Sequence, residues 1–354
     1  MDLIRVRSPY IILIDEPTQT QTKVELFTWN FGGTPTLLKT FIKNIVSPTQ
    51  IETRTNISPY IKDYIQNVYP DFTYPVIGND EITMWCYVGI VRYYRELPTD
   101  EWTEIDSFEK IATNGNTTYL QGVNAQITSD AILLYNQSQT IYYDVNSAIV
   151  PYVNFIIDGD VTGYYFRYFG IDTPATVTDI PVGSGLQLYK VPIFDDSYPN
   201  GNYLQLLDSA DLIVNSIKVL PVSECKYTPV LCSYINRFGG WDFITFFKAK
   251  KESLQVKGSD YRLNPAQWNY YFEKGQEQNF NMNGTQTIKL NTGWVEEFTA
   301  DKIQDLMLSE TVLLDSTPAK LKTSSLEIKQ KLKGRMINYE LDFEWNYNLI
   351  NDVV

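Results

Sequence analysis

Hydrophobic and polar residues alternate with a period of two along much of this chain. Three such segments occur between residues 8 and 46, namely SPYIILID, KVELFTWNF and TLLKTFIKNI, and the polar stretches EPTQTQT and GGTPT separate them. In the second segment Val24 and Leu26 alternate with Glu25 and Phe27. Because successive side chains of a strand point to opposite faces of a sheet, this pattern predicts antiparallel β-strands.

Further strand-like segments follow at EITMWCYVGIVRYYREL (81–97), NTTYLQGVNAQI (116–127) and AILLYN (131–136), with turn pairs such as Asn114-Gly115 between them. The first 145 residues then hold about seven short strands, a spacing typical of a β-sandwich. We expect an N-terminal β-sandwich over residues 1–145.

Two further blocks continue the pattern. Residues 146–220 contain VNFIIDGD, VTGYYFRYFG and LQLYKVPIF, where Asp158-Gly159 predicts a hairpin turn between the first two. Residues 221–354 predict a third, C-terminal β-rich domain. The expected fold is therefore mainly β, with two or three antiparallel β-sandwich-like domains and a few short helices.

Two segments have helical periodicity instead. Near 59–68, Ser58 is expected as the N-cap and Pro59 as the first helical residue. Near 299–310, Thr299 is the expected N-cap, and Ile303 and Leu306 share one face.

Composition limits the partners and the location. The chain has 354 residues and a net charge of −13, so we expect no nucleic-acid partner. The longest apolar stretch, AIVPYVNFII at 148–157, is shorter than a membrane span, so no membrane partner is expected. The segment MDLIRVRSPYIILID does not have the pattern of a signal peptide, which predicts synthesis and retention in the cytosol.

The residue types also restrict the chemistry. The chain has no His, which removes His-dependent nucleophilic catalysis and the common His-containing zinc sites. Phosphate-binding glycine motifs are missing too. Two Asp pairs, 158 with 160 and 195 with 196, could in principle serve a glycosidase, and the first could begin a calcium loop, but both occupy turn-like segments.

Three cysteines occur, at Cys86, Cys225 and Cys232. Their odd number does not indicate a disulfide framework, and we expect reduced thiols. A metal site at Cys225 and Cys232 is the weaker alternative, since no His accompanies them. The prediction is a protein without enzymatic activity, cofactor or metal.

The segment NRFGGWDFITFF, residues 236 to 247, is unusually aromatic around two glycines. Both of its faces are largely apolar, so it is covered on both sides. Gly239-Gly240 permits a tight reversal. The pattern favours an ordinary buried hairpin, with a subunit interface as the alternative. Candidate interface residues are Phe238, Trp241, Phe243, Phe246 and Trp294.

This segment, together with four others, resembles a family of virion proteins from tailed bacteriophages of Bacteroidetes, including crAss-like phages. The other segments are SPYIILIDEPTQTQTKVELFTWN (8–30), ISPYIKDYI (57–65), KLNTGWVEEF (289–298) and INYELDFEW (337–345). The resemblance implies a structural component of the tail or neck, made in the host cytoplasm and located in the virion. It implies no active-site residues, and it does not extend to residues 146–220.

Three functions follow as hypotheses. The first is a structural subunit whose partners are copies of itself in a ring and other virion proteins. The second is a receptor- or carbohydrate-binding module at a tail tip, with exposed aromatic side chains for a host-surface glycan. The third is a glycosidase, which requires two facing acids. The first is favoured because the other two need a site that the sequence does not reveal.

Overall fold

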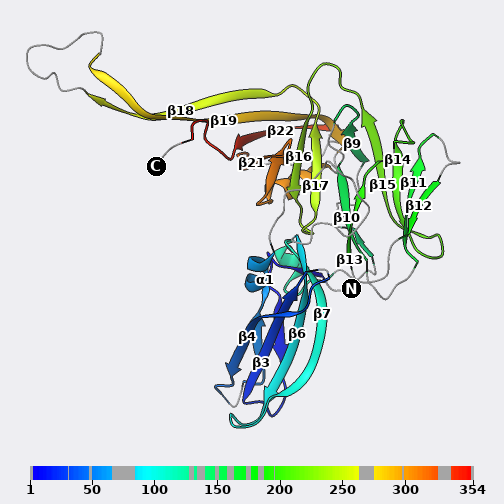
Figure 1. Cartoon of the computed structure of the whole chain (residues 1–354), viewed down its shortest axis with the longest axis vertical. Coiled ribbons are helices and arrows are strands. Elements are labelled where there is room, and N and C mark those ends of the chain that lie inside the picture. Colours follow the sequence, from blue (N-terminus) through cyan, green and yellow to red (C-terminus); the bar gives the residue numbers. More distant parts are fainter. Residues whose placement is uncertain are drawn as a thin grey trace, which may run out of the picture. The chain divides into compact units, whose positions relative to one another are not determined.

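The chain is mainly β, as the alternating pattern predicts, and two short α-helices accompany the strands (Figure 1). The computed structural model describes residues 3–30, 32–47, 50–65, 84–126, 131–133, 140–147, 151–157, 163–172, 177–181, 187–194, 196–262, 275–296, 299–325 and 336–351.

The first 145 residues supply the elements of the first sheet and its cover, together with two strands, β8 and β9, that belong to other sheets. The elements are β1 (Leu3–Arg5), β2 (Ile11–Ile14), β3 (Gln21–Trp29), β4 (Thr36–Asn44), β5 (Thr53–Asn56), α1 (Ser58–Tyr64), β6 (Trp85–Arg95), β7 (Thr103–Thr113), a 3-10 turn η1 (Tyr119–Gln121), β8 (Ala131–Leu133) and β9 (Thr140–Asp144).

Five of these strands form the first sheet, in the order β1-β7-β6-β3-β4, and β2 pairs with β5 separately. One face of the sheet is the core face, where Val24, Leu26 and Ile90 are buried. The two-stranded sheet and α1 cover it, and Ile61 of α1 is buried in the same cluster. Alternation along β3 therefore separates the core from an outer face.

The middle of the chain forms two smaller sheets, ordered β13-β10-β8 and β12-β11-β14-β15-β9. Their other strands are β10 (Tyr152–Ile157), β11 (Tyr165–Gly170), β12 (Val177–Pro181), β13 (Gln187–Pro192), β14 (Asn202–Leu207) and β15 (Ile213–Val222). Most pairs are antiparallel, although β9 joins β15 in parallel, as β1 joins β7.

The last part of the chain forms a seven-stranded sheet in the order β17-β16-β20-β21-β22-β19-β18. Its elements are β16 (Val230–Ile235), β17 (Trp241–Phe246), β18 (Lys251–Arg262), β19 (Glu277–Glu296), β20 (Val312–Leu314), β21 (Thr317–Leu321) and β22 (Met336–Trp345), with α2 (Thr299–Met307) between β19 and β20. The helix predicted near 299–310 is thus confirmed, and Ile303 and Leu306 are buried.

The described chain divides into two compact units. The first holds residues 1–223 together with 234–243 and 301–310, and the second holds 224–233, 244–300 and 311–354. The division into three domains at residues 145 and 220 stays a prediction. None of the helices in the described ranges is long and apolar enough to cross a bilayer.

Several local predictions differ from the structure. Residues 116–126 form no strand but a loop with η1, in which Tyr119 is 98% exposed. The Ser58 side chain does not cap α1; its hydroxyl donates to the Ser8 carbonyl at 2.7 Å and accepts from the Tyr10 amide. The Asp158-Gly159 turn lies outside the described residues, but the strands before and after it, β10 and β11, belong to different sheets and form no hairpin.

Candidate interaction surfaces

The two adjacent glycines form the turn between β16 and β17. The Asn236 amide donates to the Gly240 carbonyl at 3.0 Å, and the Asn236 side chain accepts from the Phe238 amide at 2.9 Å. Gly239 has a φ of 84°, in the left-handed region. This turn therefore needs a residue without a side chain.

Close packing around the turn also requires glycine at this position. A Cβ on Gly239 would come within 2.7 Å of Thr113 and of the Gly115 amide at the end of β7. A Cβ on Gly115 would lie 2.6 Å from the Arg237 carbonyl. The Thr113 hydroxyl donates to the Phe238 carbonyl at 2.7 Å. The glycines therefore let the turn dock backbone to backbone on β7.

A buried ion pair lies directly after the turn. Asp242 is fully buried, and its Oδ1 lies 3.3 Å from Nζ of Lys302 on α2, which is also buried. The Tyr234 hydroxyl donates to the Lys302 carbonyl at 3.1 Å. Burial lowers the pKa of Lys302 because it disfavours the charged amine, while the nearby Asp242 opposes this shift.

A second pair joins the turn to the same helix. Nε of Arg237 lies 3.0 Å from Oδ2 of Asp305. Burial raises the pKa of Asp305 to about 6, and Arg237 limits the rise. The two pairs hold α2 against the hairpin, and each acid already has a basic partner, so their geometry is structural.

The predicted interface residues fall into two groups. Trp241, Phe243 and Phe246 are buried within the chain, as an ordinary buried hairpin requires. Phe238 is partly buried, and Trp294 on β19 is 62% exposed. Their contact with another chain stays a prediction.

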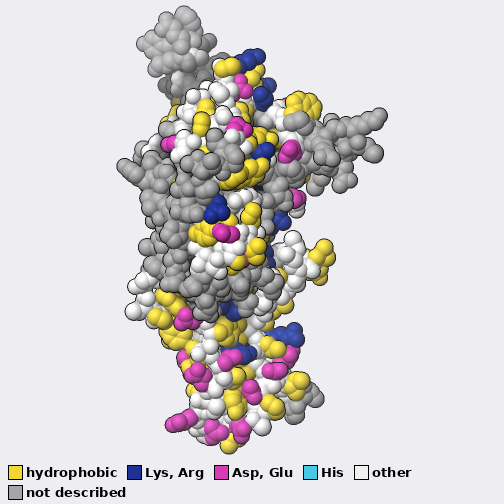
Figure 2. Space-filling model, turned by 90° about the vertical axis from the view of Figure 1, so that its right-hand side faces the viewer, with side chains coloured by type: hydrophobic (Ala, Val, Ile, Leu, Met, Phe, Trp, Pro, Cys, Tyr) yellow, Lys and Arg dark blue, Asp and Glu magenta, His cyan; other side chains and the backbone are white. Residues whose placement is uncertain are grey.

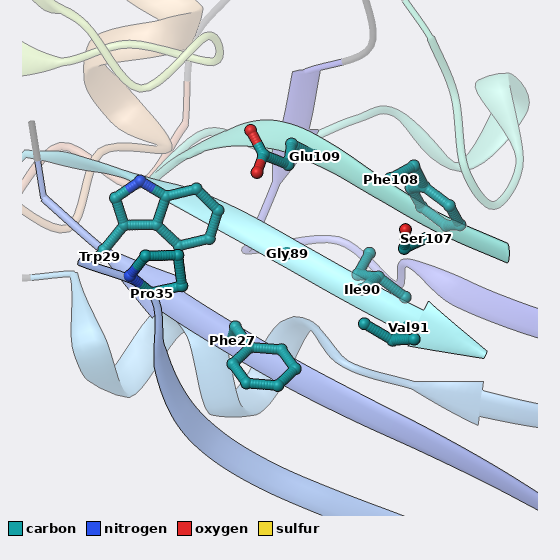
Figure 3. Close-up of a pocket in the computed structure, with 9 residues that line it drawn as sticks. All are labelled: Phe27, Trp29, Pro35, Gly89, Ile90, Val91, Ser107, Phe108 and Glu109. Carbon is teal, nitrogen blue, oxygen red and sulfur yellow. The ribbon is translucent and has the colours of Figure 1, made fainter. Parts of the chain in front are cut away.

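A shallow depression lies on the outer face of the first sheet (Figure 3). Its floor is Gly89 on β6, where a Cβ would lie 3.1 Å from the Trp29 ring and 3.3 Å from Phe27. The missing side chain leaves room for the indole to lie across the strand, and Trp29 also stacks on Tyr87 at a centroid distance of 5.5 Å. The open volume is about 470 Å³.

The polar side of this depression comes from β7. Ser107 and Glu109 point from β7 towards the same face as the aromatic rings (Figure 3). Aromatic faces combined with a few polar groups suit a sugar ring, which stacks on its apolar side and hydrogen-bonds at its edge.

The turn beside this face is strongly acidic. Residues 96–109, ELPTDEWTEIDSFE, contain six acidic side chains and no basic one. Asp106 pairs with Arg92, whereas Glu101, Glu104 and Glu109 are exposed and have no basic partner in the described part of the chain. Figure 2 shows acidic side chains gathered over this end of the sheet.

The second unit has a two-stranded ribbon. Residues 287–289 of β19 pair with both β18 and β22, whereas residues 277–286 have β18 as their only partner strand in the described chain. The ribbon extends past the ends of β21 and β22 (Figure 1). Every residue of β18 is exposed, including Leu254 at 53% and Val256 at 52%.

An isolated pair of strands is only marginally stable in water, because neither face is covered by a second layer. β18 is moreover the last strand of its sheet, so its outer edge presents unpaired backbone groups. These two properties are typical of a segment that another chain covers.

Reactive chemistry is not gathered anywhere in the described ranges. They contain no group of three or more Cys, Asp or Glu residues arranged to hold a metal ion. Cys86 is buried, which raises the pKa of its thiol to about 12; Cys232 is buried and Cys225 exposed. The residues at 158, 160 and 195 lie outside the described ranges, and Asp196 is exposed in a turn.

Comparison with models of known protein families gave no match, and comparison with curated proteins gave none either.

Neither the depression at Gly89 nor the ribbon with β18 was predicted from the sequence. The depression depends on Gly89 standing beside Trp29 and Phe27 across a strand pair, and sequence periodicity does not reveal such a cross-strand neighbour. The alternation along β18 is visible in LQVKGSDYR, yet a covered strand would show the same alternation.

Proposed function

We propose that this protein is a structural subunit that assembles with copies of itself through protein-protein contacts. The observation that supports it best is the ribbon of β18 and residues 277–286 of β19, in which every residue of β18 is exposed and the outer edge of β18 has no partner strand in the described chain. Within the chain, residues 349 and 350 contact the ribbon only at Asn283 and Gly284 among the described contacts. Such an element gains stability when a neighbouring chain covers it.

The resemblance to virion proteins of tailed bacteriophages indicates where we expect this assembly to be located. We propose a place in the tail or neck of a virion, in a closed ring of copies, next to other virion proteins. The buried ion pairs around the Gly239 turn support this function indirectly, because they fix the hairpin and α2 in one arrangement within the subunit.

Sedimentation velocity of the purified full chain over a wide concentration range tests the proposal. We expect assemblies of several copies. The fraction of protein in these assemblies should rise with protein concentration and fall with salt concentration. A single-copy protein at every concentration would contradict it.

A second candidate function is favoured by the depression at Gly89. The Trp29 and Phe27 rings beside its Gly89 floor, bordered by Ser107 and Glu109, fit a glycan of a host surface. A glycan array probed with the wild-type chain and with Trp29→Ala tests this. Glycan binding that the substitution removes supports the candidate, and an array without a hit contradicts it.

A further inference from the structure

One face of the ribbon is basic on an acidic protein. β18 and residues 277–286 together carry no net charge, because Glu252, Asp260 and Glu277 balance Lys251, Lys257 and Arg262, whereas the whole chain carries −13. These three acids stand at positions of the other face, so they do not neutralise the face with Lys251 and Lys257. The stem before β18 adds Lys248 and Lys250. Lys248 and Lys250 are engaged by Glu224 and Glu252, at 3.3 Å and 3.1 Å. The remaining positive charge is available to a partner.

Two lysines account for most of that available charge. Lys251 and Lys257 are exposed and have no acidic partner among the described residues. They are six positions apart on β18, so their side chains project from the same face of the ribbon. The same face carries the Tyr261 and Phe280 rings, whose centroids lie 5.6 Å apart.

The complementary surface lies in the other unit of the chain. At the end of the first sheet, Glu101, Glu104 and Glu109 are exposed without basic partners in the described ranges. Here β7 also has a free edge, because β1 pairs only with residues 111–113. The acidic surface therefore offers both charge and unpaired backbone groups.

We propose that the face of the ribbon with Lys251 and Lys257 docks on the acidic end of the first sheet, at Glu101, Glu104 and Glu109, in a second copy of this chain. Both surfaces are exposed within a single copy, so both are available to neighbours. The inference rests on the proposed assembly function and names the two surfaces that meet.

Two different surfaces on each copy make the contact heterologous. A head-to-tail contact of this kind closes into a ring when the rotation between neighbours allows it, and otherwise continues as a filament. Charge pairs at such a contact also select the partner, since like charges facing each other are strongly unfavourable.

Charge reversal in the full chain tests this contact. The ribbon variant is Lys251→Glu with Lys257→Glu, and the acidic-end variant is Glu101→Lys with Glu104→Lys. Each variant alone is expected to self-associate at least about tenfold more weakly than the wild type in low salt. A mixture of the two variants restores the association, because each then meets an opposite charge.

The control variant is Lys39→Glu with Lys226→Glu, which makes the same change in net charge at two exposed lysines outside the ribbon. It is expected to associate like the wild type, and circular dichroism checks that every variant is folded. If the wild type associates and the ribbon variant associates equally well, or the mixture gives no recovery, this contact is wrong while assembly stands. A wild type that stays a single copy overturns both proposals.

Discussion

At the residue scale, both the backbone conformation and the packing at position 239 require glycine. Its positive φ is unfavourable for any residue with a Cβ, and the space where that atom would lie is taken by Thr113 and Gly115. The first requirement alone costs about 1–2 kcal/mol when it is violated. The second adds a backbone clash that cannot be relieved by moving a flexible side chain.

We therefore expect Gly239→Ala to lower the free energy of unfolding by more than about 2 kcal/mol. Gly32→Ala is the matched control: Gly32 also has a positive φ, of 72°, but nothing lies within 4 Å of its added Cβ. Urea unfolding of both variants measures the difference. Equal losses in the two variants would show that packing against β7 contributes nothing.

The Asp242–Lys302 pair gives a second prediction at this scale. Replacing Lys302 by Met leaves the carboxylate of Asp242 buried without its base, and such a loss typically costs about 3–5 kcal/mol. The double replacement Asp242→Leu with Lys302→Met removes both charges and should recover much of that loss. Chemical denaturation of the wild type, both single variants and the double variant gives the coupling energy. A coupling energy near zero would show that Asp242 and Lys302 do not stabilise each other.

Asp305 predicts a dependence of stability on pH. Its pKa of about 6 in the folded protein lies above the ordinary value of 3.8, so the folded state binds the proton more tightly. The contribution to stability is complete below about pH 4 and is lost as the pH rises through about 6. Its charged neighbours are Arg237, Asp242, Asp301 and Lys302.

We expect the free energy of unfolding to fall as the pH rises from 4 to about 6.5, and we expect Asp305→Asn to remove this pH-dependent slope. Thermal unfolding at several pH values measures it, with Asp301→Asn, an exposed acid on the same helix, as the control. An unchanged slope in the Asp305 variant would contradict the raised pKa.

At the scale of single elements, the sequence predicted some strands and not others for physical reasons. β3 was predicted because one of its faces is core and the other is outer, so alternation is strong. β7 was missed because TEIDSFEKIAT has exposed, charged residues over most of its length and is a strand only through its pairing with β6.

The strand predicted at 116–127 is wrong over residues 116–126, the part of it that the structure describes. Tyr119 and Leu120 lie exposed in η1, so their apolar character does not report burial. The docking of Gly239 on β7 joins residues more than a hundred positions apart, and single-sequence patterns do not contain such long-range contacts. The burial of Trp241 and Phe243 could be predicted from the sequence, because both faces of that strand are apolar.

The ribbon also predicts a contrast between two apolar positions in the same pair of strands. Leu254→Ala, where the side chain is 53% exposed, is expected to change the stability of the single copy by less than about 0.5 kcal/mol. Ile288→Ala, where the side chain is buried, should cost about 2–5 kcal/mol. Urea unfolding at low protein concentration measures both, and equal losses would show that the ribbon is covered within its own chain.

At the scale of the whole molecule, the described surfaces differ in charge and in exposure. One unit carries an acidic sheet end, the other carries a ribbon with Lys251 and Lys257 on one face, and the described residues form no group of three or more acids or cysteines that could hold a metal ion. The assembly that we propose needs rigid subunits and complementary surfaces, and the ion pairs of Asp242 with Lys302 and of Arg237 with Asp305 hold the turn at Gly239 and α2 in one arrangement.

Electron cryomicroscopy of the full chain, in low salt and at a concentration where it associates, tests the central claim most directly. The expected result is a ring or stack in which every ribbon of β18 and β19 lies against a neighbouring copy. Single copies whose ribbons remain surrounded by solvent at all concentrations would contradict it.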